Sequence, residues 1–207
     1  LLTTFSKELA ASLAGKLAIL IEANPAARDR IAVRSLDTAA VELYTAQFEQ
    51  PNRATPSQIR SLIGEAQKAG LGGDLTAAFL LEEWTELVDA WGVTDAESYA
   101  TIPRTGRRTR LGPRQREAVW AVFDAVRHSL ERRGLVTWAM IYGRLTEWLC
   151  SGGRMPFQHV VVDEAQDLTV AQVRFLVEAG RGRDDALFLA GDIGQRIFRL
   201  PFSWAKL

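Results

Sequence analysis

The chain has 207 residues, 47% of them hydrophobic, and equal numbers of basic and acidic side chains, 25 of each. This length is enough to bury one sizeable core and a smaller second one, whereas a net charge of zero argues neither for nor against a nucleic-acid partner. The single cysteine, Cys150, excludes an internal disulfide, and no apolar run approaches the roughly 20 residues of a membrane span, so we expect a soluble, cytoplasmic protein with no membrane partner.

The chain from about residue 36 to residue 150 is predicted to be mostly helical, after a short strand at Ile31–Val33. Apolar residues recur there at intervals of three and four, which places them on one face of each helix. The predicted helices are Leu36–Phe48, Pro56–Gly70, Asp74–Ala90, Pro113–Arg133 and Thr137–Cys150. This pattern favours a helical subdomain inserted between two strands of a sheet.

A basic segment lies within this helical region. It holds six arginines in 13 residues and no acid: Arg104, Arg107, Arg108, Arg110, Arg114 and Arg116. Prolines and glycines interrupt it, so a loop is predicted. Such a loop could contact the phosphates of DNA, with Arg107 and Arg108 as the candidate residues, or it could be an ordinary solvated loop.

Val160–Val162 predicts a strand of a parallel sheet that is buried on both faces, and it ends on the acidic pair Asp163–Glu164. The carboxyl ends of such strands open into a crevice where ligands bind. One carboxylate could hold Mg²⁺ while its neighbour orients or deprotonates an attacking water. The alternative is an acidic turn without function, since turns are rich in acids.

A second predicted strand, Ala186–Ala190, is followed by the polar run Gly191–Phe198. Between the two strands, apolar spacing predicts a helix over Thr169–Gly180, with Thr169 as N-cap and Gly180 as the C-terminal stop. Strand, helix and strand then place acids and amides at two neighbouring strand ends, facing one crevice.

The sequences DEAQD (Asp163–Asp167) and GDIGQRIF (Gly191–Phe198) resemble motifs II and III of superfamily 1 helicases of the UvrD, Rep and PcrA kind. The opening, Leu1–Ala10, resembles motif Ia, a strand that turns into a helix beside single-stranded DNA. The resemblance implies an α/β fold: a partial RecA-like motor domain of the P-loop NTPase type, with a parallel sheet and an inserted, mainly helical subdomain. We expect motor segments at residues 1–35 and 151–207 and the insertion at 36–150.

The same resemblance implies ATP and Mg²⁺ as cofactors. Asp163 would hold Mg²⁺, Glu164 would polarise the attacking water, and Gln195 would couple the γ-phosphate to the DNA site. Further residues on the nucleotide side would be Gln166, Asp167 and Asp192. Asp167 could instead be an N-cap of the following helix, or fill both roles.

The implied partners are single-stranded DNA, or a junction of single and double strands, and the remaining helicase domains. Besides the two loop arginines, the candidate DNA contacts are Thr4, Phe5, Lys7, Phe198 and Trp204. Phe5 could stack on a base or simply pack between sheet and helix. Phe198 replaces the tyrosine usual in this motif. The segment Arg199–Trp204 departs from the family's Gly-Trp-Arg-Gly, so Trp204 could take the stacking role from a shifted position, or the role is absent.

The pattern GxxxxGK[ST], whose backbone and lysine hold nucleotide phosphates, does not occur in the chain. Motifs IV to VI of the resembled family are missing as well. We therefore expect an internal piece of an ATP-dependent DNA helicase that moves 3′ to 5′, and no ATP turnover by this piece alone. The alternatives are a non-catalytic DNA-binding or regulatory module that keeps the fold, and the motor part of a helicase–nuclease.

Overall fold

A computed structural model describes residues 1–104 and 109–192. Within the described residues, the chain divides into two compact units, residues 1–50 with 142–192 and residues 51–104 with 109–141. We call the first the sheet unit and the second the helical unit. The helical unit spans fewer residues than the insertion predicted at 36–150. The predicted helix at Leu36–Phe48 and most of the one at Thr137–Cys150 belong to the sheet unit.

Within the described residues, four strands form a parallel sheet in the order β2-β1-β3-β4. The strands are β1 (Leu2–Thr4), β2 (Val33–Ser35), β3 (Val160–Val162) and β4 (Leu187–Leu189). Each has three residues, and Val160 and Val162 of β3 are buried. A parallel sheet combined with many helices confirms the predicted α/β fold class.

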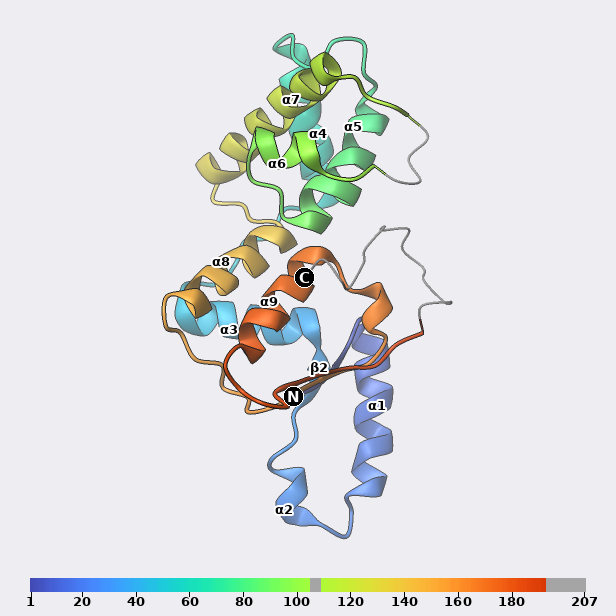
Figure 1. Ribbon diagram of the computed structural model, residues 1–207, viewed down its shortest axis with the longest axis vertical. Coiled ribbons are helices and arrows are strands. Elements are labelled where there is room, and N and C mark those ends of the chain that lie inside the picture. The colour runs from blue at the N-terminus through green and yellow to red at the C-terminus, as the bar shows by residue number, and fades with distance from the viewer. Residues whose placement is uncertain (105–108, 193–207) are drawn as a thin grey trace. The chain divides into compact units, whose positions relative to one another are not determined.

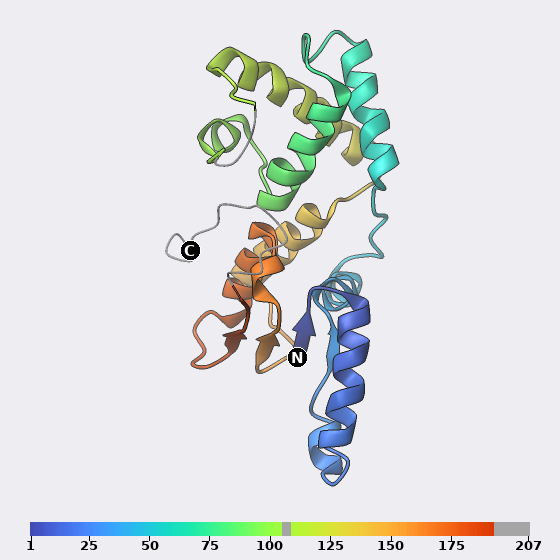
Figure 2. The same ribbon diagram turned by 90° about the vertical axis from the view of Figure 1, so that its right-hand side faces the viewer.

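The helices of the sheet unit flank these strands. They are α1 (Lys7–Leu20), α2 (Pro25–Arg28), α3 (Leu36–Gln47), α9 (Val170–Gly180) and, from Tyr142 onward, α8 (Trp138–Cys150). Helix α1 packs against β1 and β2, and Figure 1 shows α3, α8 and α9 grouped away from it. Figure 2 shows the strands side by side with α1 beside them. Right-handed crossovers from β1 to β2 and from β3 to β4 run in opposite directions along the sheet, which places α1 and α9 on opposite faces.

The predicted helix at Thr169–Gly180 is confirmed. Thr169 caps it, accepting from the backbone N–H of Gln172, whose side chain in turn accepts from the backbone N–H of Thr169. This capping box fixes where α9 begins, shortly after the turn that follows β3.

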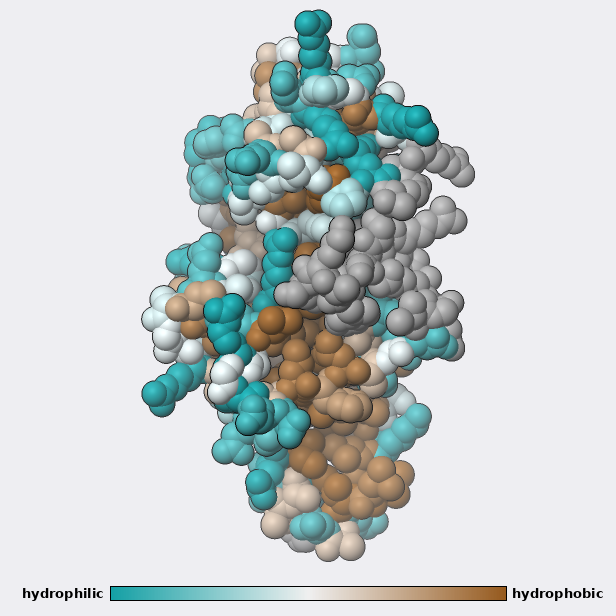
Figure 3. All heavy atoms as spheres, viewed as in Figure 1, coloured by the Kyte–Doolittle hydropathy of each residue, from teal (hydrophilic) through white to brown (hydrophobic). Residues whose placement is uncertain are grey.

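An apolar area covers part of the sheet unit's surface (Figure 3). Among the described residues of this unit, the exposed large hydrophobic side chains are Phe5, Leu9, Ile19, Leu20, Ile31, Val177 and Phe188. Phe188 is 62% exposed although it lies within strand β4. One face of this sheet is thus not fully covered by the described residues.

The helical unit has its own hydrophobic core. Its elements are α4 (Pro56–Lys68), α5 (Ala77–Glu83), a π-helix (Trp84–Asp89), α6 (Ala96–Thr101) and α7 (Pro113–Arg132), and α8 begins in it. Ile63, Leu80, Phe123 and Leu130 are fully buried in this core. The single helix predicted over Asp74–Ala90 is in fact α5 followed by the π-helix, and α6 was not predicted. Among the described residues, no helix is long and apolar enough to cross a membrane.

Candidate functional site

The candidate site is the sheet edge at which β1, β3 and β4 end. The parallel register brings these ends level, so the residues that follow the strands meet there. The backbone ties the edge together: the N–H of Asp163 donates to the carbonyl of Thr3 at 2.9 Å, and the N–H of Ala165 donates to the carbonyl of Ala190 at 2.8 Å. The turn after β3 is therefore bonded to both neighbouring strand ends.

Glu164 has an unusual backbone conformation in this turn. Its φ of 57° and ψ of 40° lie in the left-handed region, which residues with a side chain rarely adopt. Such a conformation costs on the order of 1–3 kcal/mol, persists only where the surroundings impose it, and is concentrated at functional sites. The Asp163 side chain accepts from the Glu164 N–H at 3.0 Å, which helps to impose it. Asp163 is exposed and Glu164 partly so, and both carboxylates are accessible to a ligand.

Gln166 joins the acidic turn to the segment after β4. Its amide nitrogen donates to Glu164 Oε2 at 2.5 Å, and its amide oxygen accepts from the backbone N–H of Asp192 at 3.1 Å. An amide side chain can donate through its nitrogen and accept through its oxygen at the same time, and it does not titrate. Because Gln166 is 9% exposed, solvent competes little for these bonds. The side chain of Gln166 therefore fixes the Glu164 carboxylate relative to the neighbouring strand.

Gly191 permits this close approach. A Cβ atom at Gly191 would overlap with Gln166 Oε1 and would lie 3.0 Å from the backbone nitrogen of Ala165. The bridging role of Gln166 did not follow from the sequence, where a coupling amide was expected only at Gln195. The glycine that opens the second motif was the available signal, since it marks a place where another chain segment comes near.

The remaining acids of the two motifs differ in exposure. Asp192 is exposed, whereas Asp167 is 6% exposed and its Oδ1 has no hydrogen-bond partner within the described part of the chain. Asp167 lies in a short 3₁₀ helix (Ala165–Asp167), and its alternative role as the N-cap of the following helix is wrong, because Thr169 caps α9. No group of three or more His, Cys, Asp or Glu side chains that could hold a metal occurs in residues 1–104 and 109–192.

The predicted DNA contacts near the start of the sequence, Thr4, Phe5 and Lys7, differ in their exposure to solvent. Phe5 follows β1 and is 40% exposed, and Lys7 is the exposed first residue of α1. Thr4 is buried at 2% exposure, which argues against a direct contact of its hydroxyl with phosphate. Ser6, between Phe5 and Lys7, accepts from the N–H of Leu9 and caps α1.

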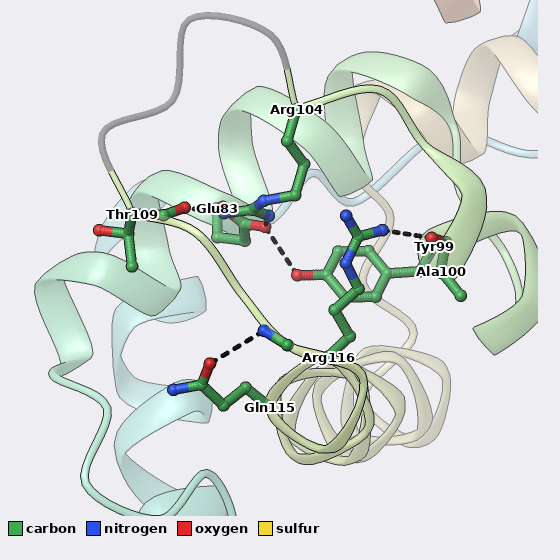
Figure 4. A network of polar contacts seen from close by, with 8 residues as sticks. Glu83, Tyr99, Ala100, Arg104, Thr109, Gln115 and Arg116 are labelled. Carbon is green, nitrogen blue, oxygen red and sulfur yellow. Dashed lines mark hydrogen bonds and ion pairs between the residues drawn. The ribbon is translucent and has the colours of Figure 1, made fainter.

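Two arginines of the basic segment bind the protein itself. Figure 4 shows the Arg104 guanidinium beside the carboxylate of Glu83, with which it pairs and which also accepts from the Tyr99 hydroxyl at 2.6 Å. Glu83 is fully buried, so its charge is compensated inside the helical unit. Arg104 also donates to the carbonyl of Thr109, and Arg116 donates to the carbonyl of Ala100. Arg104 and Arg116 therefore anchor the basic segment, a role that was not predicted from the sequence.

Several predicted residues lie outside the described part of the chain. They are the loop arginines Arg107 and Arg108, the coupling residue Gln195, and the aromatic residues Phe198 and Trp204.

The model of the UvrD/REP helicase N-terminal domain matches residues 1–202. No curated protein that we compared matches the chain. The family match covers both strand-end motifs and everything between them, and it agrees with the parallel sheet. The chain belongs to the UvrD/REP helicase N-terminal domain family.

Proposed function

We propose that this chain carries the hydrolytic edge of an ATP-dependent motor that moves 3′ to 5′ along single-stranded DNA. The observation that supports this most is the left-handed Glu164, held by the Asp163 carboxylate on one side and by Gln166 on the other. An acid with a strained backbone and a carboxylate fixed by a buried amide is suited to orient a water molecule. An acidic turn without function would require neither the strained backbone nor the fixed carboxylate.

The residues present fit Mg²⁺ and ATP. Mg²⁺ in nucleotide sites is usually held by one or two carboxylates, together with water and phosphate oxygens, so a cluster of three or more protein ligands is not required. Asp163, exposed at the end of β3, would be the direct carboxylate ligand. When bound, the metal ion neutralises the charge that develops on the phosphate oxygens.

The side chains of this turn would have different roles in ATP hydrolysis. Glu164 would accept the proton of the attacking water. Gln166 would hold the Glu164 carboxylate in place and connect it, through its second hydrogen bond, to the backbone of Asp192. Asp167 would support the turn from its buried position, and Asp192 and Gln195 would lie toward the nucleotide. The backbone and lysine that grip phosphates would come from another part of the protein, because no GxxxxGK[ST] run occurs here.

DNA would be contacted by residues outside this turn. Phe5 is exposed enough to stack on a base, and Lys7 to meet a phosphate. Arg107, Arg108, Phe198 and Trp204 complete the proposed DNA-contacting set.

The test is Glu164→Gln in the full-length protein. The amide keeps the size of the side chain but cannot accept a proton, so DNA-stimulated ATP hydrolysis should fall by roughly 10²–10⁴-fold, the contribution typical of general base catalysis. Nucleotide binding, measured with a fluorescent ATP analogue, should remain. Glu131→Gln, at an exposed position of α7, removes the same charge and should leave hydrolysis unchanged. Turnover that survives in Glu164→Gln would show that Glu164 is not the base. Absence of hydrolysis in the unmodified protein would favour a non-catalytic DNA-binding module.

A further inference from the structure

A buried polar cluster joins α3, α8 and α9 on the side of the sheet unit where these helices pack together. The Tyr142 hydroxyl donates to Asp37 Oδ1 at 2.7 Å, and the Gln172 amide nitrogen donates to the same oxygen at 3.1 Å. Tyr142 is 1% exposed and Gln172 is 9% exposed. The Tyr142 ring also packs against Phe175 of α9, with the ring centroids 5.6 Å apart.

Gln172 connects this cluster to the start of α9. Its amide oxygen accepts from the backbone N–H of Thr169 at 2.8 Å and from the Thr169 hydroxyl at 3.1 Å. The amide nitrogen is thereby left to point at Asp37, so one side chain caps the helix and anchors it. Leu168 alone separates Thr169 from the 3₁₀ helix that carries Gln166 and Asp167.

The chemistry of the cluster favours a fixed geometry. Burial, together with the neighbouring Asp37 carboxylate, raises the pKa of Tyr142 well above its usual value of 10.0, so the hydroxyl keeps its proton and remains a donor. Hydrogen bonds to a charged group contribute more than neutral ones and are shorter, and in a buried position they are little screened. The oxygen that both donors share belongs to α3, which immediately follows β2.

We propose that Asp37, Tyr142 and Gln172 are positioning residues for ATP turnover: they hold the N-terminus of α9 and thereby fix the turn that presents Glu164 and Gln166. None of the three touches the reacting groups. Their effect is exerted through the backbone from Thr169 back to Glu164, whose left-handed conformation depends on support from its surroundings. This inference rests on the proposed function.

The test compares two tyrosine-to-phenylalanine changes in the full-length protein. Tyr142→Phe removes the hydroxyl that bonds α8 to the shared oxygen beside α9. Tyr44→Phe is the matched control: it removes a buried hydroxyl of α3 that accepts from Arg144 of α8 at 2.9 Å, a bond that does not involve α9. Both changes remove one α3–α8 hydrogen bond, but only Tyr142→Phe also removes the hydroxyl to which the Gln172 amide nitrogen of α9 donates at 3.5 Å.

We expect Tyr142→Phe to lower kcat for DNA-stimulated ATP hydrolysis by roughly fivefold or more, the lower end of coupling between sites, while KM for ATP stays within about twofold. Tyr44→Phe should keep kcat. The melting temperature, recorded for both variants, shows whether each is folded. Equal kcat in the two variants, whether both are normal or both are reduced, would overturn the inference.

A second pair of variants tests the shared acceptor. Asp37→Asn keeps an oxygen that can accept from both donors and should retain most of kcat, whereas Asp37→Leu should lose it as Tyr142→Phe does. Full activity in a folded Asp37→Leu protein would contradict the role of the cluster. Absence of ATP hydrolysis in the unmodified protein would overturn the proposed function and this inference with it, whereas unaltered variants of an active protein would overturn the inference alone.

Discussion

Gly191 leads to a stability prediction at the scale of single residues. In Gly191→Ala, the new methyl group would overlap with Gln166 Oε1 and press on the backbone of the acidic turn, so the turn or the strand end must shift. Overpacking of this kind costs about 1–3 kcal/mol. We expect the free energy of unfolding, measured with denaturant, to fall by that amount, and ATP hydrolysis by the full-length protein to fall with it.

Gly15→Ala is the control for this substitution. Gly15 lies within α1 of the same unit and has no atom within 4 Å of the position of a new Cβ. Alanine is favoured over glycine inside a helix by roughly 0.5–1 kcal/mol, so this variant should be slightly more stable. If Gly191→Ala were equally well tolerated, the close approach of the two motifs would not be a constraint on the site.

Residue chemistry could be predicted from sequence better than residue geometry. The acids Asp163 and Glu164 follow a buried strand as predicted, because an apolar run that ends on charged residues marks a strand end. The left-handed backbone of Glu164 could not be predicted, since nothing in the residue type favours it and only the surrounding bonds impose it. The burial of Thr4 at the end of β1 could not be predicted either, because threonine is common both on protein surfaces and within strands.

At the scale of elements, the π-helix Trp84–Asp89 ends on Asp89, an acid that is partly buried. Burial raises the pKa of Asp89 above its ordinary value of 3.8, although hydrogen bonds from the Thr137 side chain and the Ala139 backbone oppose part of this shift. The folded state therefore binds the proton of Asp89 more tightly than the unfolded state does. Its contribution to stability is full below about pH 3.8 and is lost as the pH rises through the raised pKa.

Asp89→Asn tests this linkage. The amide stays neutral at every pH and can still accept from the Ala139 N–H. Relative to the unmodified protein, the variant should therefore gain stability as the pH is raised from about 4 to about 7. Denaturant unfolding at several pH values measures the difference, and Asp74→Asn, at an exposed position, is the charge-matched control. A difference that does not vary with pH would show that the charged form of Asp89 is not destabilising.

Sequence periodicity located most helices and missed the irregular ones. Pro56 and Pro113 begin α4 and α7 as predicted, because proline fixes the backbone for a first helical turn. The π-helix could not be predicted, because its buried residues Trp84, Leu87 and Val88 form an apolar face that a regular α-helix would also present. The six residues of α6 are too few for periodicity to be read from sequence.

At the scale of the whole molecule, basic and acidic side chains are equal in number, so any electrostatic attraction to DNA must be local and can be tested by mutation. The net charge is zero, so attraction to DNA would have to come from clusters such as the basic segment. Changing Arg107 and Arg108 together to Ala should weaken binding of single-stranded DNA. It should also reduce the slope of log affinity against log salt by about 0.7 for each phosphate that these arginines neutralise. Titrations at several salt concentrations measure both quantities.

The comparison variant removes two charges elsewhere. Arg28 and Arg30 are exposed in the sheet unit, and changing both to Ala should alter the slope less than the loop variant does. Unchanged affinity and slope in the loop variant would exclude Arg107 and Arg108 from the DNA-contacting set. Arg104 and Arg116 are unsuitable for this test, because their guanidinium groups bind Glu83 and Ala100.

Chain-level organisation was only partly predictable. The two polar strand ends and the inserted helices follow from local patterns, but the order β2-β1-β3-β4 depends on pairings between distant segments: the N-terminus donates to the carbonyl of His159, 158 residues away in sequence. The predicted insertion began at residue 36, whereas α3 and most of α8 belong to the sheet unit. The apolar faces of α3 and α8 predict that these helices pack against other elements, but they do not identify those elements.

The position of β1 between β2 and β3 has a consequence for protein synthesis. A ribosome adds about 5–20 residues per second, so the interval between completing β2 at Ser35 and β3 at Val162 is on the order of ten seconds. During that interval β1 lacks its partner β3, whereas the residues that form the core of the helical unit, from Ile59 to Leu135, precede β3 in the sequence. In nascent chains stalled before residue 160, β1 and β2 should therefore be more sensitive to protease than in the finished chain, because β3 is not yet present to cover the edge of β1.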